Sequence, residues 1–163
     1  MSVFLGYILF ITIIIIALMA WFIYDEHKRN KSKMSFKESL DLVGLPVVTF
    51  YQHGNKYHFL LDSGASNCCI NKDILSTIKH TNTNYESSMY GYDGVPNKVD
   101  IVNIDLFYKD SHFNSDFMIV DLKAAFEDIK NTSGVNITGI LGSDFLSKYK
   151  YILDYKENIA YIK

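Results

Sequence analysis

The chain of 163 residues has little cysteine and little excess charge. Its two cysteines, Cys68 and Cys69, are adjacent and cannot form an ordinary disulfide framework. We therefore expect both to be reduced and to act as small apolar residues. The formal net charge of −2 provides no basic surface for nucleic acid, and no basic stripe accompanies the aromatic residues. A disulfide scaffold and a nucleic-acid-binding protein are both disfavoured.

Several common catalytic motifs are also missing. The five histidines show no His-Glu-x-x-His spacing, and the cysteines form no Cys-x-x-Cys pair, so we expect no metal. The sequence has no Gly-x-Ser-x-Gly nucleophile elbow and no phosphate-binding glycine loop. We therefore expect a protein that works without a cofactor.

One long apolar run is present at the N-terminus, from Val3 to Tyr24, and it contains no charged residue. A helix of this length spans roughly the 30 Å hydrocarbon core of a bilayer, at about 1.5 Å per residue. No basic region precedes the run, and Trp21-Phe22-Ile23 follow its small residues where a mature protein would begin with polar ones. The run predicts a transmembrane helix, with a cleaved signal peptide as the alternative.

The charges beside this run predict its orientation. Lys28, Arg29, Lys31 and Lys33 all follow the run, whereas only the amino terminus precedes it. By the positive-inside rule, the remainder of the chain lies in the cytoplasm, with the N-terminus outside. The sequence therefore predicts a single-pass membrane protein with residues 3–24 in the bilayer.

The remainder divides into a short connection and a β-rich body. We expect an anchor at 1–24, a juxtamembrane linker and short helix at 25–44, and one domain at 45–163. Ser35 and Glu38 have capping-box spacing before a helix that ends near Gly44, and residues 25–33 are polar. Apolar alternation and turn residues predict three hairpins, with a helical turn or loop at 124–130. Their strands are expected at 45–51 and 57–61, 99–107 and 113–122, and 151–155 and 159–162.

The most informative motif is Asp62-Ser63-Gly64-Ala65, which ends the apolar run 57–61. By chance the tripeptide occurs in roughly one chain of this length in twenty, and a simple turn after a strand has the same residues. A carboxylate followed by a hydroxyl and a glycine is also half of a site in which two carboxylates share one proton across a water. Since the chain has one copy, this reading requires a homodimer.

Two further segments accompany this motif. Ile140-Leu141-Gly142 is an apolar pair before glycine, a pattern that lets a strand pass closely behind a loop. Ser143 or Asp144 is placed to cap the amphipathic stretch 145–149. Residues 87–96 lie between two strand-like runs and predict a hairpin tip that contains Tyr90, Gly91, Tyr92, Asp93 and Gly94. The two tyrosines either bind substrate or pack across the hairpin.

This order of motifs resembles the retropepsin-like family of single-lobe aspartic proteases over about residues 45–163. The resemblance implies a mostly β fold: a closed, barrel-like lobe with one short C-terminal helix, here preceded by a transmembrane helix. It implies that the lobe dimerises, that each copy supplies a catalytic Asp62, and that the hairpin tip is a flap over an extended peptide. Ser63 would brace the loop of the partner, Gly64 would allow the tight loop, and Ala65 would line the substrate channel. Ser66 stands where retroviral members usually have a second aspartate.

The sequence thus predicts a membrane-anchored homodimeric aspartic endopeptidase acting on a protein or peptide. One Asp62 would activate a water as general base, while the protonated Asp62 of the other copy polarises the scissile carbonyl. Two alternatives remain: a non-catalytic module that keeps the fold for dimerisation or peptide binding, and an anchor with an inert β domain.

Overall fold

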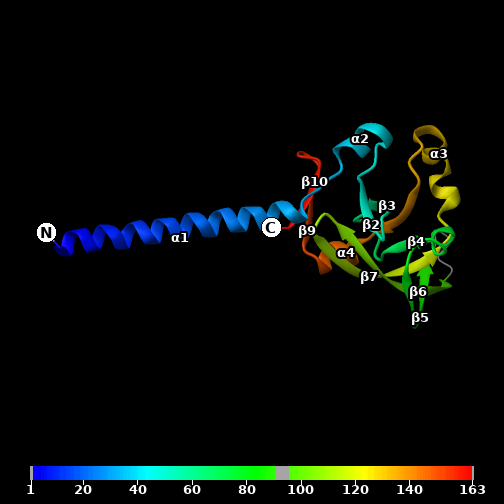
Figure 1. Ribbon diagram of the computed structural model, residues 1–163. Helices are drawn as coiled ribbons and strands as arrows, with labels where there is room; N and C mark the ends of the chain where they lie inside the picture. The colour runs from blue at the N-terminus through cyan, green and yellow to red at the C-terminus, as the bar shows by residue number, and fades with distance from the viewer. Residues whose placement is uncertain (1, 91–95, 163) are drawn as a thin grey trace.

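The computed structural model describes residues 2–90 and 96–162, and it consists of one long helix followed by a mostly β domain (Figure 1). Helix α1 runs from Ser2 to Ser32. Its apolar window, Gly6–Glu26, is long enough to cross a membrane, and none of it is buried against the domain. A signal sequence near an N-terminus has the same features. The predicted polar linker at 25–33 is wrong over most of its length, because this stretch lacks glycine and proline and continues the helix.

A small sheet lies at the end of α1. Strand β1 (Met34–Ser35) pairs antiparallel with β10 (Ile159–Ile162), which pairs antiparallel with β9 (Tyr151–Asp154). The hairpin of β9 and β10 confirms the predicted hairpin at the C-terminus. Strand β1 was not predicted, because two residues are too few to show a period.

Helix α2 (Lys37–Val43) confirms the predicted short helix. It ends at Gly44, whose φ of 69° is the left-handed conformation that glycine adopts readily at a helix C-terminus. The predicted capping box is wrong: the N-cap residue is Phe36, and no side chain caps the helix. Ser35 is held in β1 instead, so its hydroxyl does not cap α2.

The main sheet has seven strands in the order β2-β3-β8-β4-β7-β6-β5. Strand β2 also pairs with β6, through Tyr51 and Phe107. Two neighbouring pairs, β3 with β8 and β4 with β7, are parallel. The strands of this sheet are β2 (Val47–Gln52), β3 (Asn55–Leu61), β4 (Cys69–Asn71), β5 (His80–Tyr90), β6 (Pro96–Tyr108), β7 (Ser111–Val120) and β8 (Ile137–Leu141).

The other two predicted hairpins are also present. Strands β2 and β3 are joined by His53 and Gly54 alone, with φ values of 49° and 81°. Two positive φ angles in a two-residue loop match the twist of antiparallel strands. The turn is therefore shorter than the predicted turn at 52–56. Lys109, with φ of 51°, lies in the turn between β6 and β7.

Three helical segments lie between or after these strands: the 3₁₀ turn η1 (Lys72–Ile74), α3 (Lys123–Ser133) and α4 (Ser143–Lys148). Helix α4 is the short C-terminal helix that was predicted. Helix α3 is three turns long, where only a helical turn or loop was expected, and it ends at Gly134 with φ of 75°.

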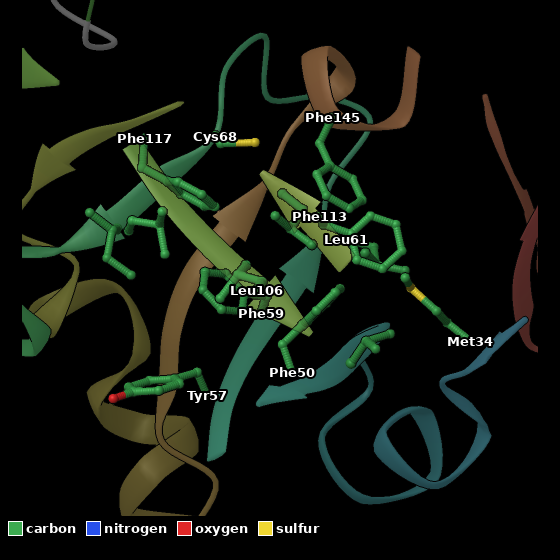
Figure 2. Close-up of a cluster of buried hydrophobic side chains, with 14 of the residues drawn as sticks. Met34, Phe50, Tyr57, Phe59, Leu61, Cys68, Leu106, Phe113, Phe117 and Phe145 are labelled. Atoms are coloured by element: carbon green, nitrogen blue, oxygen red, sulfur yellow. The ribbon is translucent and has the colours of Figure 1, made fainter. Parts of the chain in front are cut away.

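Aromatic side chains are eight of the 20 buried residues in the main core cluster, part of which Figure 2 shows. Phe50 and Phe59 meet edge to face with ring centroids 5.7 Å apart, and Phe50 meets Phe113 in the same way at 5.8 Å. Phe145, from α4, packs on Phe113 with centroids 5.5 Å apart. Such pairs stabilise a fold by about 0.5–1.5 kcal/mol each beyond the area they bury. This packing holds α4 against β2 and β7, and α4 begins directly after β8 ends.

Candidate active site

Asp62 leaves the sheet directly after β3. The preceding Leu61 is 2% exposed, which fixes the strand in the core, whereas Asp62 itself is partly exposed. The amide nitrogen of Asp62 donates a hydrogen bond to the carbonyl oxygen of Leu141 at 3.0 Å. The strand end therefore presents a carboxylate to solvent from a backbone that is held by β8.

The loop after Asp62 folds back on the carboxylate. The amide nitrogen of Gly64 donates to Asp62 Oδ1 at 2.9 Å, and the amide nitrogen of Ala65 donates to the Asp62 carbonyl at 3.2 Å. A Cβ atom on residue 64 would lie 3.1 Å from Asp62 Oδ1. A side chain at Gly64 would crowd the carboxylate, so glycine suits this position.

The two sequence motifs meet because β3 and β8 are parallel. Leu60 pairs with Ile140 and Leu61 pairs with Leu141. Parallel strands end at the same edge of a sheet, so Asp62 and Gly142 emerge next to each other. Leu141 is fully buried and Ile140 is partly exposed.

Gly142 passes behind the loop in close contact. A Cβ atom on residue 142 would lie 2.7 Å from both the carbonyl carbon and the carbonyl oxygen of Asn67, and 2.9 Å from the carbonyl oxygen of Ala65. These are backbone atoms that cannot move aside as a flexible side chain can. A residue without a side chain is needed here, as the apolar-apolar-glycine pattern indicated.

Backbone hydrogen bonds join the start of α4 to the same loop. The amide nitrogen of Ser143 donates to the carbonyl oxygen of Ala65 at 2.8 Å, and that of Asp144 donates to the carbonyl oxygen of Ser66 at 3.3 Å. Ser143 Oγ also donates to the Ser66 carbonyl, at 3.2 Å. The first N–H groups of a helix have no partner inside it, and here two of them hold the loop.

Asp144 was predicted to cap α4, and the structure corrects this. The N-cap residue is Gly142, and no side chain caps the helix. Asp144 instead accepts hydrogen bonds from Cys68, with Oδ2 at 2.9 Å from the amide nitrogen and Oδ1 at 3.1 Å from Sγ. Oδ1 also accepts from the amide nitrogen of Phe145. The side chain therefore links α4 to the end of the Asp62 loop, a role that spacing alone did not reveal.

Both cysteines are free and buried, and their environment keeps them protonated. Burial raises the pKa of the Cys68 thiol, and the hydrogen bond and charge of Asp144 raise it further. Burial, followed by the charge of Asp144, raises the pKa of Cys69 to about 11. A protonated Cys68 thiol is the donor that the carboxylate of Asp144 requires.

Gly139 is a second close approach, at a position outside the two motifs. A Cβ atom there would lie 2.5 Å from the carbonyl oxygen of Cys69 and 2.7 Å from the ring of Phe59. A glycine in the middle of a strand is the signal that could have revealed it.

The flap candidates lie only partly within the described residues. Strands β5 and β6 pair antiparallel up to Tyr90 and Pro96, so the predicted hairpin extends at least that far. Tyr90 is the last residue of β5. Gly91, Tyr92, Asp93 and Gly94 are outside the described residues.

Two other features bear on the chemistry. Within residues 2–90 and 96–162, no group of three or more His, Cys, Asp and Glu side chains could hold a metal ion. A groove of about 570 Å³ is lined by residues of α2, β2, β3 and β6, and the Asp62 loop forms no part of its lining.

The structure brings most of the predicted loop-support residues together. Asp62, Gly64, Ala65, Leu141 and Gly142 are joined by the contacts above, while Ser63 is exposed at the tip of the loop. Ile140 is brought in through its pairing with β3.

Comparison with known proteins agrees with this geometry. No curated protein matches the chain. A family model described as aspartyl protease matches residues 48–145, a range that begins in β2, includes the Asp62 loop and Gly142, and ends in α4. That range is more than half of the chain, so the protein belongs to the aspartyl protease family.

Proposed function

We propose that the protein is a membrane-anchored homodimeric aspartic endopeptidase. One observation carries the proposal: a partly exposed Asp62 ends a buried strand, and its loop is held from behind by Gly142 and the first turn of α4. A preorganised carboxylate of this kind is the half-site that an aspartic protease requires.

The proposed mechanism uses two copies of this half-site. Two Asp62 carboxylates about 3 Å apart cannot both ionise, so they share one proton. The ionised carboxylate takes a proton from the bridging water, which attacks the scissile carbonyl, and the protonated carboxyl donates a hydrogen bond to the carbonyl oxygen. No covalent intermediate with the enzyme forms: the tetrahedral intermediate collapses when the carboxyl that took the proton from water gives it to the leaving nitrogen, and the C–N bond breaks. The hydrogen bond from the Gly64 amide to Asp62 Oδ1 would fix the orientation of each carboxylate.

The remaining loop residues have proposed roles as well. Exposed Ser63 would brace the loop of the other copy, and Ala65 would line the substrate channel. The flap would be the tip of the β5–β6 hairpin. We also propose that the lobe is barrel-like, since β2 pairs with both β3 and β6 and so links the two sides of the sheet.

The anchor is proposed to be α1. Its apolar window spans Gly6–Glu26, and no side chain of this window is buried in the domain, as expected of a surface that faces lipid. The basic residues Lys28, Arg29 and Lys31 follow it in the sequence and favour a cytoplasmic domain.

The test compares Asp62→Asn with wild type in the full chain, reconstituted in vesicles. The amide has nearly the same shape but can neither accept nor share the catalytic proton. We expect peptide hydrolysis to fall by at least about 10²- to 10⁴-fold, with circular dichroism and dimer content unchanged. Asp128→Asn, on the exposed face of α3, is the matched control and should keep full activity. Activity of Asp62→Asn within a few-fold of wild type would overturn the mechanism and favour a non-catalytic, peptide-binding role.

A further inference from the structure

Helix α1 enters the domain without a flexible linker. It ends at Ser32, and β1 begins two residues later at Met34. Met34 pairs with Ala160 and Ser35 pairs with Ile159. Met34 is fully buried, and Phe36 is 1% exposed. Met34 and Phe36, which follow the helix directly, are therefore part of the domain core and not of a flexible tether.

Hydrogen bonds from other parts of the domain hold the same junction. The Tyr151 hydroxyl donates to the carbonyl oxygen of Ser32 at 2.8 Å, and Lys109 Nζ donates to the carbonyl oxygen of Lys33 at 3.2 Å. The amide nitrogen of Phe36 donates to the carbonyl oxygen of Asn158 at 3.0 Å. The end of the helix is thus fixed by β9, by the β6–β7 turn and by the β9–β10 turn.

These contacts limit how far the candidate site lies from the bilayer. Beyond its apolar window, α1 continues only from Glu26 to Ser32, or about 9 Å at 1.5 Å per residue. The β6–β7 turn touches this end of the helix through Lys109. In Figure 1, the other ends of β5 and β6 lie on the far side of the domain from α1.

The end of the Asp62 loop, at Cys68, lies partway along the β6–β7 hairpin. The amide nitrogen of Met118 donates to the carbonyl oxygen of Cys68, and Met118 pairs with Ile101. From Tyr108 to Ile101 is seven residues of β6, or about 23 Å at roughly 3.3 Å per residue. Added to the roughly 9 Å of α1 beyond its apolar window, this places the end of the loop on the order of 30 Å from the hydrocarbon, and a tilt of the hairpin makes the distance smaller.

From this fixed mount we infer the substrate class: a juxtamembrane segment of another membrane protein, lying within about 30 Å of the same bilayer surface. This rests on the proposed function and on α1 as a membrane span. A tethered substrate in the same membrane meets the enzyme at a high effective concentration, so no additional binding contact is required. A domain held rigidly on α1 would then select cleavage sites by their distance from the membrane surface, because its active site cannot move outward to reach more distant ones.

The experiment distinguishes an effect of the distance between cleavage site and membrane from an effect on catalytic activity itself. The full chain is compared with a variant that has a flexible 20-residue Gly/Ser insert between Ser32 and Lys33, which adds a root-mean-square reach of roughly 25 Å. The same insert between His53 and Gly54, in the exposed β2–β3 turn, is the control that leaves the junction intact. Substrates are single-pass proteins with one cleavage sequence at the end of a helical spacer of about 15 Å or about 60 Å. A soluble peptide with the same sequence is assayed in parallel.

Wild type and the control insert should cleave the near site at least about tenfold faster than the far site. The junction insert should reduce this ratio at least about fivefold, without changing hydrolysis of the soluble peptide. Equal cleavage of near and far sites by wild type, or an unchanged ratio in the junction variant, would overturn the inference. Loss of soluble-peptide hydrolysis in all three proteins would instead count against the proposed protease function.

A second measurement does not depend on activity. Glu127, exposed on α3, is replaced by cysteine and labelled, while Cys68 and Cys69 are buried. Energy transfer from this label to a lipid dye in the vesicle reports the height of the domain. We expect a narrow distribution in the otherwise native chain and lower, broader transfer in the junction variant. Identical transfer in the two proteins would show that the junction does not fix the height.

Discussion

Gly142 lies so close to Asn67 that a Cβ atom on residue 142 would be 2.7 Å from the Asn67 carbonyl carbon. Nothing comparable surrounds Gly54, where the space within 4 Å is empty and only the φ of 81° favours glycine. Close packing requires a glycine at position 142, whereas backbone conformation favours one at position 54. The same substitution at each position tests the two requirements separately.

Gly142→Val should damage activity strongly. The added side chain would push against the backbone of the Asp62 loop, with an overpacking cost of about 1–3 kcal/mol and displacement of the carboxylate. Gly54→Val should lower stability by about 1–3 kcal/mol through backbone strain, while the folded fraction keeps its activity. Hydrolysis per folded molecule, measured with the free energy of unfolding, distinguishes the two. Equal specific activity in folded Gly142→Val and wild type would show that this glycine does not position Asp62.

The site was predictable to the extent that its residues act through local sequence. Asp62 to Ala65 end a strand, and Ile140 to Gly142 show a pattern whose steric meaning is independent of the remaining fold. The hydrogen bonds of Asp144 were not predictable, because they depend on bringing Cys68 beside α4. That approach results from the antiparallel pairing of β4 with β8, which places Cys69 opposite Ile140, and no local pattern specifies which strands will pair.

Asp144→Asn should weaken the Asp62 loop although residue 144 is not catalytic. The amide keeps one acceptor oxygen but turns a donor group toward the N–H or S–H of Cys68. Losing one hydrogen bond to a charged acceptor costs about 1.5–3 kcal/mol. We expect lower kcat with a smaller change in KM, because the reacting carboxylate is displaced while the flap is untouched.

Cys68→Ala provides the internal comparison for Asp144. It removes only the Sγ bond and leaves the amide bond, so its effect on kcat should be smaller. Asp73→Asn, at an exposed position, should leave both kinetic parameters unchanged. If Asp144→Asn matches the Asp73 control in kcat and stability, the bridge to Cys68 has no positioning role.

The fold divides in the same way between local and distant interactions. The three hairpins and α2 were predicted, because turn residues and apolar alternation act over a few residues. The extension of α1 through residues 25–32 was missed, since charged residues are as compatible with an exposed helix as with a linker. Strand β1 was missed because its two residues are strand-like only when β10 lies beside them.

His58 should make stability depend on pH in the range where carboxylates do not titrate. Burial, together with the charge of Lys56, lowers the pKa of this histidine from its ordinary value of 6.5. The unfolded chain therefore binds the proton more readily, and stability falls as pH decreases from 6.5 through the folded-state pKa. Thermal unfolding from pH 7 to pH 5 should show this decrease in wild type and a flatter profile in His58→Gln. His53→Asn, in the exposed turn, should keep the wild-type slope.

The junction and the dimer can be tested together in soluble fragments. A fragment of residues 33–163 keeps β1 and should fold, whereas one of residues 37–163 loses the buried Met34 and Phe36 side chains. Each such loss costs roughly 2–5 kcal/mol, which is large against the stability of a small domain.

If two Asp62 residues form the site, activity of the longer fragment should fall faster than linearly on dilution. Specific activity that is independent of concentration in a sedimenting monomer would place the second catalytic group within the same chain.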